Sequence, residues 1–164
     1  MAALDPVETL QRVPFFAVLR GEELKALARH CVVRHITKDE LLFAEGDPCE
    51  GLFVVQEGAI KLFKMADTGR EQVLMIERAG STVAELPIFD GGNFPTSASA
   101  VENSTLLFLP KRVFLDLCRR NCSMGLASLE RPSVCYDRCA AEVCPAAPQR
   151  TAHSPCGGDY SCIQ

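Results

Sequence analysis

A series of short extended runs between Cys31 and Leu109 constrains the fold more than any other feature of this sequence. The runs are rich in β-branched and aromatic residues, and most breaks between them contain Gly, Asp, Asn or Pro. The seven predicted strands cover residues 32–36, 40–44, 52–56, 59–65, 72–77, 96–102 and 105–109. Seven or eight short strands with regular turns indicate a sandwich or a barrel, and this spacing fits a jelly roll.

Helices are predicted on both sides of the strands. Apolar residues recur at helical spacing between residues 5 and 30, where Pro14 divides them into two segments, and again between residues 110 and 120. The predicted fold is therefore mainly β with flanking helices. Its predicted core is made of Leu42, Phe43, Phe53, Val55, Ile60, Leu62, Leu74, Ile76, Val83, Phe89, Leu107 and Leu109.

The segment from Gly80 to Ala100 is predicted to form a very short helical turn between two strands. Pro87 suits the first helical position because its missing N–H would be unpaired there anyway. Asp90, Gly91 and Gly92 are expected to end the turn, since glycine adopts positive φ without a steric cost. The N-terminus of a short helix offers unpaired N–H groups and a partial positive charge. The segment is therefore a candidate site for a phosphate or another anion.

This segment resembles the phosphate-binding cassette of the cyclic-nucleotide-binding domain, in the form found in Crp/Fnr-type bacterial transcription regulators. The family pattern has a Gly, then a Gly-Glu-Leu turn and, further along, an Arg followed by small residues. Glu85 stands where the family has its ribose-binding Glu, and Ala84 replaces the Gly before it. The resemblance extends over roughly residues 8–120 and implies a double-stranded β-helix, or jelly roll. The ligand-binding residues that it implies are Gly80, Glu85, Leu86, Pro87, Pro95, Thr96 and Ser97.

Pro95 occupies the position of the family's Arg, which pairs with the cyclic phosphate. Proline has no charge and no N–H donor, so it cannot make that bidentate, charge-assisted contact. The run Phe94-Pro95-Thr96 is similar to that of Crp/Fnr relatives that do not use cyclic AMP. The resemblance therefore implies an effector-sensing regulatory domain that does not respond to cyclic AMP, with a small-molecule effector, a nucleotide or another anion, still to be identified.

Two alternatives remain for this cassette. One is a genuine cyclic-nucleotide-binding module, for cyclic AMP or cyclic GMP, in which Glu85 contacts the ligand. The other is that the Glu85 carboxylate caps neighbouring N–H groups inside the turn, which needs no ligand.

The composition changes abruptly after Asn121. Six of the nine cysteines and four prolines follow it, and the apolar periodicity is lost beyond residue 130. We therefore expect a sensor domain over residues 1–121 and a disordered Cys/Pro-rich tail over residues 122–164, without the dimer helix and the helix-turn-helix that follow in the family. A shifted reading frame or a truncated gene is the hypothesis for this change. The tail cysteines form no C-x2-C pair, so neither a zinc nor an iron–sulfur site is predicted there.

Charge and hydropathy limit the expected partners. The formal net charge is −4 and no cluster of Lys and Arg is present, so the chain alone is not expected to bind DNA. No apolar run reaches ~18 residues and the N-terminus lacks the features of a signal peptide, which predicts a cytoplasmic protein without a membrane span. The family's homodimer contact is expected to be lost or weak, because Pro132 limits the helix that begins at Ser123 to fewer than the ~12–15 residues at which an isolated helix is marginal.

An enzyme is the contrasting class. Metal-dependent cupins are also jelly rolls, and they hold a metal with paired His and a Glu on adjacent strands. His30 and His35 are not in an H-x-H arrangement, and no nucleophile–base pair or Gly-rich P-loop is visible. We therefore predict a binding domain that is not an enzyme and carries no metal or other cofactor.

Overall fold

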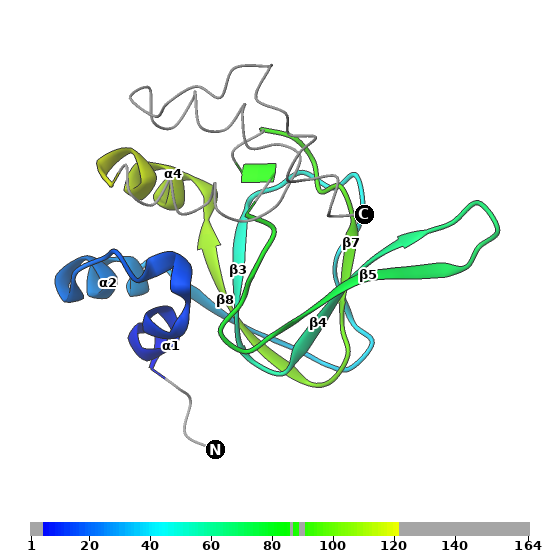
Figure 1. Cartoon of the computed structure of the whole chain (residues 1–164), viewed down its shortest axis with the longest axis horizontal. Coiled ribbons are helices and arrows are strands. Elements are labelled where there is room, and N and C mark those ends of the chain that lie inside the picture. Colours follow the sequence, from blue (N-terminus) through cyan, green and yellow to red (C-terminus); the bar gives the residue numbers. More distant parts are fainter. Residues whose placement is uncertain (1–4, 86, 89–90, 122–164) are drawn as a thin grey trace, which may run out of the picture.

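The chain starts with short helices, continues into two antiparallel sheets and reaches a further helix at the end of its described part (Figure 1). The computed structural model describes residues 5–85, 87–88 and 91–121. The helical elements are α1 (Pro6–Arg12), the 3-10 helix η1 (Pro14–Phe16), α2 (Gly21–Ala28) and α4 (Lys111–Arg120). The strands are β1 (Val32–Ile36), β2 (Leu41–Phe43), β3 (Gly51–Glu57), β4 (Ala59–Met65), β5 (Glu71–Arg78), β6 (Thr82–Val83), β7 (Ser97–Ala100) and β8 (Ser104–Pro110).

The strands form two four-stranded sheets with the orders β1-β8-β3-β6 and β2-β7-β4-β5. Along the chain they alternate between the two sheets, with the single exception of the hairpin made by β4 and β5. All the pairings in both sheets are antiparallel. The predicted fold class, a jelly roll with flanking helices, is confirmed.

The predicted elements lie where the residue pattern placed them. Each predicted strand overlaps one observed strand, and β4 has the predicted bounds of 59 and 65. The additional strand β6 has only two residues, too few for a periodic pattern to reveal. Pro14 separates α1 from η1 as expected. Within the described ranges, no helix is both long and apolar enough to cross a membrane. The predictions made for residues 122–164, for Leu86 and for Phe89 lie outside the described residues.

The core fills the space between the two sheets and continues beneath the helices. Phe114 of α4 is fully buried and stacks on Phe15 of η1, with 5.4 Å between the ring centroids. This contact joins α4 to η1, which are far apart in the sequence. Eight of the predicted core residues are buried and a ninth, Leu62, is partly buried; the eight are Leu42, Phe43, Phe53, Val55, Ile60, Val83, Leu107 and Leu109.

Two of the predicted core residues are not buried, so that part of the prediction was wrong. Leu74 and Ile76 are 48% and 47% exposed. Both belong to β5, which stands at the edge of its sheet and forms a hairpin with β4 that projects from the body of the domain (Figure 1). The apolar pattern of β5 alone resembles that of a buried strand, whereas its edge position depends on pairings that a strand pattern does not specify.

Candidate functional site

The start of the cassette segment is hydrogen-bonded to β3, an interior strand that pairs with β8 and β6. The N–H of Gly80 donates to the carbonyl of Val55, and the N–H of Val55 donates to the carbonyl of Ser81, each over 2.9 Å. Gly80 has φ of +89°, in the left-handed region that favours glycine. Gly80 thus lies in the turn that leads the chain from β5 in one sheet to β6 in the other.

Ala84 departs from the family pattern at a position where the backbone is constrained. Its φ is +72°, and it is one of two non-glycine residues with positive φ in the described part of the chain. An L-residue with a Cβ is strained in this region, whereas glycine is not. The structure therefore explains why the family pattern has a Gly immediately before the Glu.

Replacing Ala84 by glycine is expected to stabilise the fold. Relief of the left-handed strain is worth ~1–2 kcal/mol, and the added flexibility of the unfolded chain offsets ~0.5–1 kcal/mol of it. The free energy of unfolding should therefore rise by roughly 0.5–1 kcal/mol in urea denaturation. Ala79→Gly is the matched control, because Ala79 is exposed and lacks a positive φ, and it should be neutral or destabilising. Equal effects at the two positions would contradict the strain at Ala84.

The predicted helical turn is present after Ala84. Pro87 and Ile88 are helical and buried, and Ile88 is 1% exposed. Glu85, the candidate ribose contact, is half-buried at the entrance to this turn. Ile88 was missed as a core residue because the turn in which it lies is too short for a strand or helix period to extend through it.

The second half of the cassette is anchored by an aromatic stack. Phe94 is buried, and its ring lies nearly parallel to that of Phe43, with 3.8 Å between the centroids. Its N–H donates to the carbonyl of Asp47 and its carbonyl accepts from the N–H of Gly46, both over 2.9 Å. Pro95 follows directly and is exposed. The aromatic residue of the aromatic-Pro-small run thus packs in the core, while the proline faces outward.

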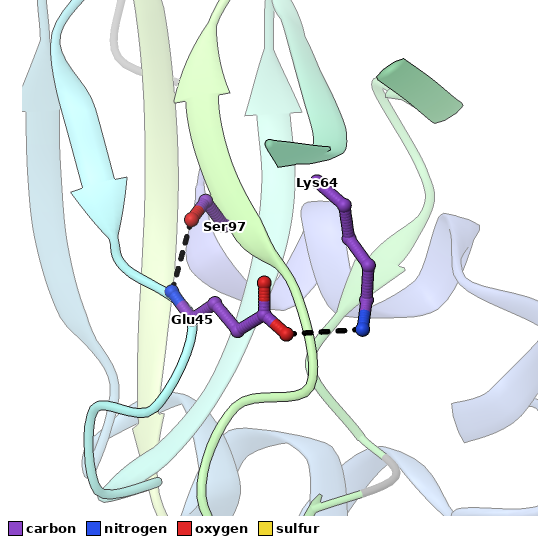
Figure 2. Close-up of polar contacts among 3 residues, drawn as sticks. All are labelled: Glu45, Lys64 and Ser97. Atoms are coloured by element: carbon purple, nitrogen blue, oxygen red, sulfur yellow. Dashed lines mark hydrogen bonds and ion pairs between the residues drawn. The ribbon is translucent and has the colours of Figure 1, made fainter. Parts of the chain in front are cut away.

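Ser97 and Lys64 are both bound to Glu45, as Figure 2 shows. The backbone N–H of Glu45 donates to the Ser97 hydroxyl oxygen over 2.9 Å. The Lys64 ammonium donates to the Glu45 carboxylate over 3.0 Å and forms a salt bridge with it. Ser97 therefore fastens the loop after β2 to the end of the cassette, and the positive charge of Lys64 is paired next to it. The sequence pattern does not reveal this contact, because Glu45 is 52 residues from Ser97.

The cassette has no positive charge of its own. Between Gly80 and Ala100 the sequence contains no Lys, Arg or His, while Glu85 and Asp90 are acidic. β4, which pairs with β7, carries Lys61 and Lys64, and each has a carboxylate partner.

Of the predicted site residues, the structure describes Gly80, Glu85, Pro87, Pro95, Thr96 and Ser97; the last two are half-buried.

Metal-binding groups do not gather in the described ranges 5–85, 87–88 and 91–121: no three His, Cys, Asp or Glu side chains there are arranged to hold a metal ion. The cysteines in this part, Cys31, Cys49 and Cys118, are free thiols. Burial raises the pKa of Cys31 to about 11 and that of Cys118 to about 12, and it also raises the pKa of Cys49.

These thiols are expected to react slowly while the protein is folded. The thiolate is the nucleophile, and with raised pKa values it is scarce at mildly alkaline pH. Alkylation of Cys118 by iodoacetamide, followed by peptide mass spectrometry, should be much slower in buffer than in urea. Peptide mapping distinguishes alkylated Cys118 from alkylated cysteines beyond Asn121. Equal rates of Cys118 alkylation in buffer and in urea would contradict its burial.

The sequence pattern of the family described as "Cyclic nucleotide-binding domain" matches residues 33–121, more than half of the 164-residue chain. The chain belongs to this family. The chain is 31% identical over 107 residues to the "Cyclic AMP receptor protein" of Thermus thermophilus, covering 65% of the chain and 50% of that protein. It is 35% identical over 77 residues to the "Transcriptional activator protein anr" of Pseudomonas aeruginosa, covering 47% of the chain and 31% of that protein.

Solved structures agree with the sequence relatives. The sensor domain of the transcriptional regulator DNR from Pseudomonas aeruginosa has a TM-score of 0.69 and 25% identity, and the match covers 74% of this chain and 82% of that one. The N-terminal domain of a transcriptional regulator from Streptomyces coelicolor has a TM-score of 0.64 and 30% identity, with 74% and 86% covered. The resemblance to Crp/Fnr-type sensor domains is thus confirmed, and the chain spans half or less of the length of the two curated relatives above.

Proposed function

We propose that this cyclic nucleotide-binding domain senses a small-molecule effector for a Crp/Fnr-type transcription regulator, and that the effector is not cyclic AMP. The domain acts in the cytoplasm as a binding module rather than an enzyme. Effector binding shifts the balance between two conformations, to an extent set by the difference in the effector's affinity for them.

The charge distribution of the cassette carries this proposal. Between Gly80 and Ala100 the sequence offers a cyclic phosphate no Lys, Arg or His to pair with. Pro95 provides neither charge nor N–H donor, and Lys64 is paired with Glu45. A charge-assisted hydrogen bond is worth ~1.5–3 kcal/mol. An anion bound without such a bond loses its hydration and gains no ion pair in return. An effector of lower negative charge fits this cassette better.

A cyclic-nucleotide-binding module is the second candidate. Glu85 matches the family's ribose contact, and one relative is named a cyclic AMP receptor protein. The backbone N–H groups of the helical turn that contains Pro87 would then hold the phosphate without an Arg.

Thermal denaturation of the full chain with a panel of effectors separates these candidates. A ligand present at 100 times its Kd stabilises a protein by ~2.7 kcal/mol, which raises Tm measurably. We expect no rise with cyclic AMP or cyclic GMP, and a rise with a ligand of a different class, with haem and nitric oxide as the first to be tested. A rise with cyclic AMP would favour the second candidate.

We also propose that this chain alone does not recognise a DNA sequence. Its formal net charge is −4, and it spans half or less of the regulators described above. A mobility-shift assay over a promoter library at near-physiological salt is the test, since low salt favours non-specific contacts. Sequence-selective retention would contradict this part of the proposal.

A further inference from the structure

A pocket of about 240 Å³ lies between β1, β2, β8 and the loop that joins β2 to β3. Its apolar wall includes Phe43, Phe94 and Phe108. Phe43 and Phe94 are buried, and Phe108 is half-buried. An engineered apolar cavity of ~150 Å³ binds benzene, so this pocket has room for one aromatic ring and a few further atoms. Aromatic walls favour an aromatic ligand, because rings attract one another in offset or edge-to-face contacts.

Arg34 of β1 supplies a positive charge to this pocket. Arg34 is exposed, and its guanidinium carbon lies 5.8 Å from the centroid of the Phe53 ring. Within the described ranges, Arg34 forms no salt bridge. The carboxylate of Glu40, which feels the charge of Arg34, accepts its hydrogen bonds from Thr37 instead. Since a guanidinium group binds a carboxylate through two parallel hydrogen bonds, Arg34 is placed to bind a ligand carboxylate.

Asp47 and Glu50 line the same pocket from the loop and bring negative charge to it. Both are exposed, and neither forms a salt bridge with a residue that the structure describes. The Asp47 carboxylate accepts from the N–H of Ala44 over 3.0 Å, which fixes this part of the loop. An anion in the pocket is attracted by Arg34 and repelled by the two carboxylates, and a cation meets the reverse. A ligand that carries both charges avoids this conflict.

The three charged residues of the pocket are exposed, whereas two of its three aromatic residues are buried. Both charges of a ligand therefore belong at one end and its apolar part at the other, which is the arrangement in an α-amino acid. We propose that this pocket binds an α-amino acid with an aromatic side chain. Its carboxylate pairs with Arg34, its ammonium group faces Asp47 and Glu50, and its ring packs on the apolar wall. None of the predicted cassette contacts lines the pocket, so the site stands whether or not the cassette binds an effector.

Calorimetry of the full chain with L-phenylalanine and three analogues tests the proposal. Hydrocinnamate lacks the ammonium group of L-phenylalanine, phenethylamine lacks its carboxylate, and L-alanine lacks its ring. We expect L-phenylalanine to bind saturably at millimolar concentration. Hydrocinnamate and phenethylamine should each bind roughly 5-fold more weakly, the fold-change that ~1 kcal/mol from an exposed ion pair gives. L-alanine should bind more weakly still, because it buries no ring.

Two substitutions of exposed residues assign the charges. Arg34→Gln should weaken the binding of L-phenylalanine roughly 5-fold and leave that of phenethylamine no weaker, because phenethylamine has no carboxylate. Glu50→Gln should weaken L-phenylalanine by less, since Asp47 remains, and leave hydrocinnamate no weaker. Arg29→Gln is the matched control, because Arg29 is exposed and does not line the pocket, and it should change nothing. Circular dichroism shows that each variant is folded.

Three results would overturn the proposal. Absence of saturable L-phenylalanine binding by the folded chain would mean that the pocket does not take an amino acid. Equal affinities for L-phenylalanine and hydrocinnamate would mean that the ammonium group is not recognised. Unchanged L-phenylalanine binding by Arg34→Gln would place the ligand at another site.

Discussion

Replacing Pro95 by arginine is expected to raise the affinity of this domain for cyclic AMP by roughly 10- to 150-fold over the parent chain. The estimate converts the ~1.5–3 kcal/mol of one charge-assisted hydrogen bond into affinity. Pro95 is exposed at the end of the cassette, so the longer side chain does not have to enter the core. Phe94 holds the preceding backbone through its stack on Phe43.

Two further variants separate charge from other effects. Pro95→Gln adds a polar side chain without charge and should gain much less affinity than Pro95→Arg. Glu85→Ala in the arginine background should lose part of the gain, because Glu85 is the candidate ribose contact. Circular dichroism must first show that each variant is folded, since proline also restricts the residue before it. A folded Pro95→Arg protein with no measurable binding would mean that the cassette differs from the cyclic AMP-binding form at more than this residue.

Gly58→Ala is expected to destabilise the fold strongly. Gly58 joins β3 to β4 with φ of +90°, and an added Cβ would lie 2.2 Å from the Ser104 hydroxyl oxygen. That hydroxyl accepts from the N–H of Ala59 over 3.1 Å and is buried. Left-handed strain of ~1–2 kcal/mol and an unsatisfied buried group of ~1–3 kcal/mol together predict a loss of about 2–5 kcal/mol.

Gly69→Ala is the matched control for this prediction. Gly69 has φ of +77° at the tip of the β4–β5 hairpin, and an added Cβ would meet no atom within 4 Å. This variant isolates the backbone strain, so the free energy of unfolding should fall by only ~1–2 kcal/mol. Urea denaturation of the two variants gives the comparison. If Gly58→Ala were no worse than Gly69→Ala, the close packing against Ser104 would be refuted.

The sequence predicts local features of this protein well and long-range ones poorly. The bounds of β4 and the break at Pro14 follow from residues close together in the chain. The exposure of Leu74 and Ile76 does not, because it depends on β5 being an edge strand. An apolar run gives the same pattern whether its neighbours cover it or leave it open.

The same distinction applies to the candidate site. Pro95 and Glu85 are found from the sequence because they keep their spacing within one segment. The pairing of Glu45 with Lys64 and with Ser97 joins residues 19 and 52 positions apart. No periodicity connects such positions, so the pairing of Lys64 with Glu45 becomes visible only in the folded chain.

Isothermal titration calorimetry of the unmodified chain with cyclic AMP tests the central claim most directly. The claim is that a cassette with two acidic residues and no basic one between Gly80 and Ala100 does not hold a cyclic phosphate. We predict no saturable heat of binding under conditions in which the folded Pro95→Arg variant gives a measurable isotherm. Saturable binding of cyclic AMP by the unmodified chain, with one site per domain, would contradict the account.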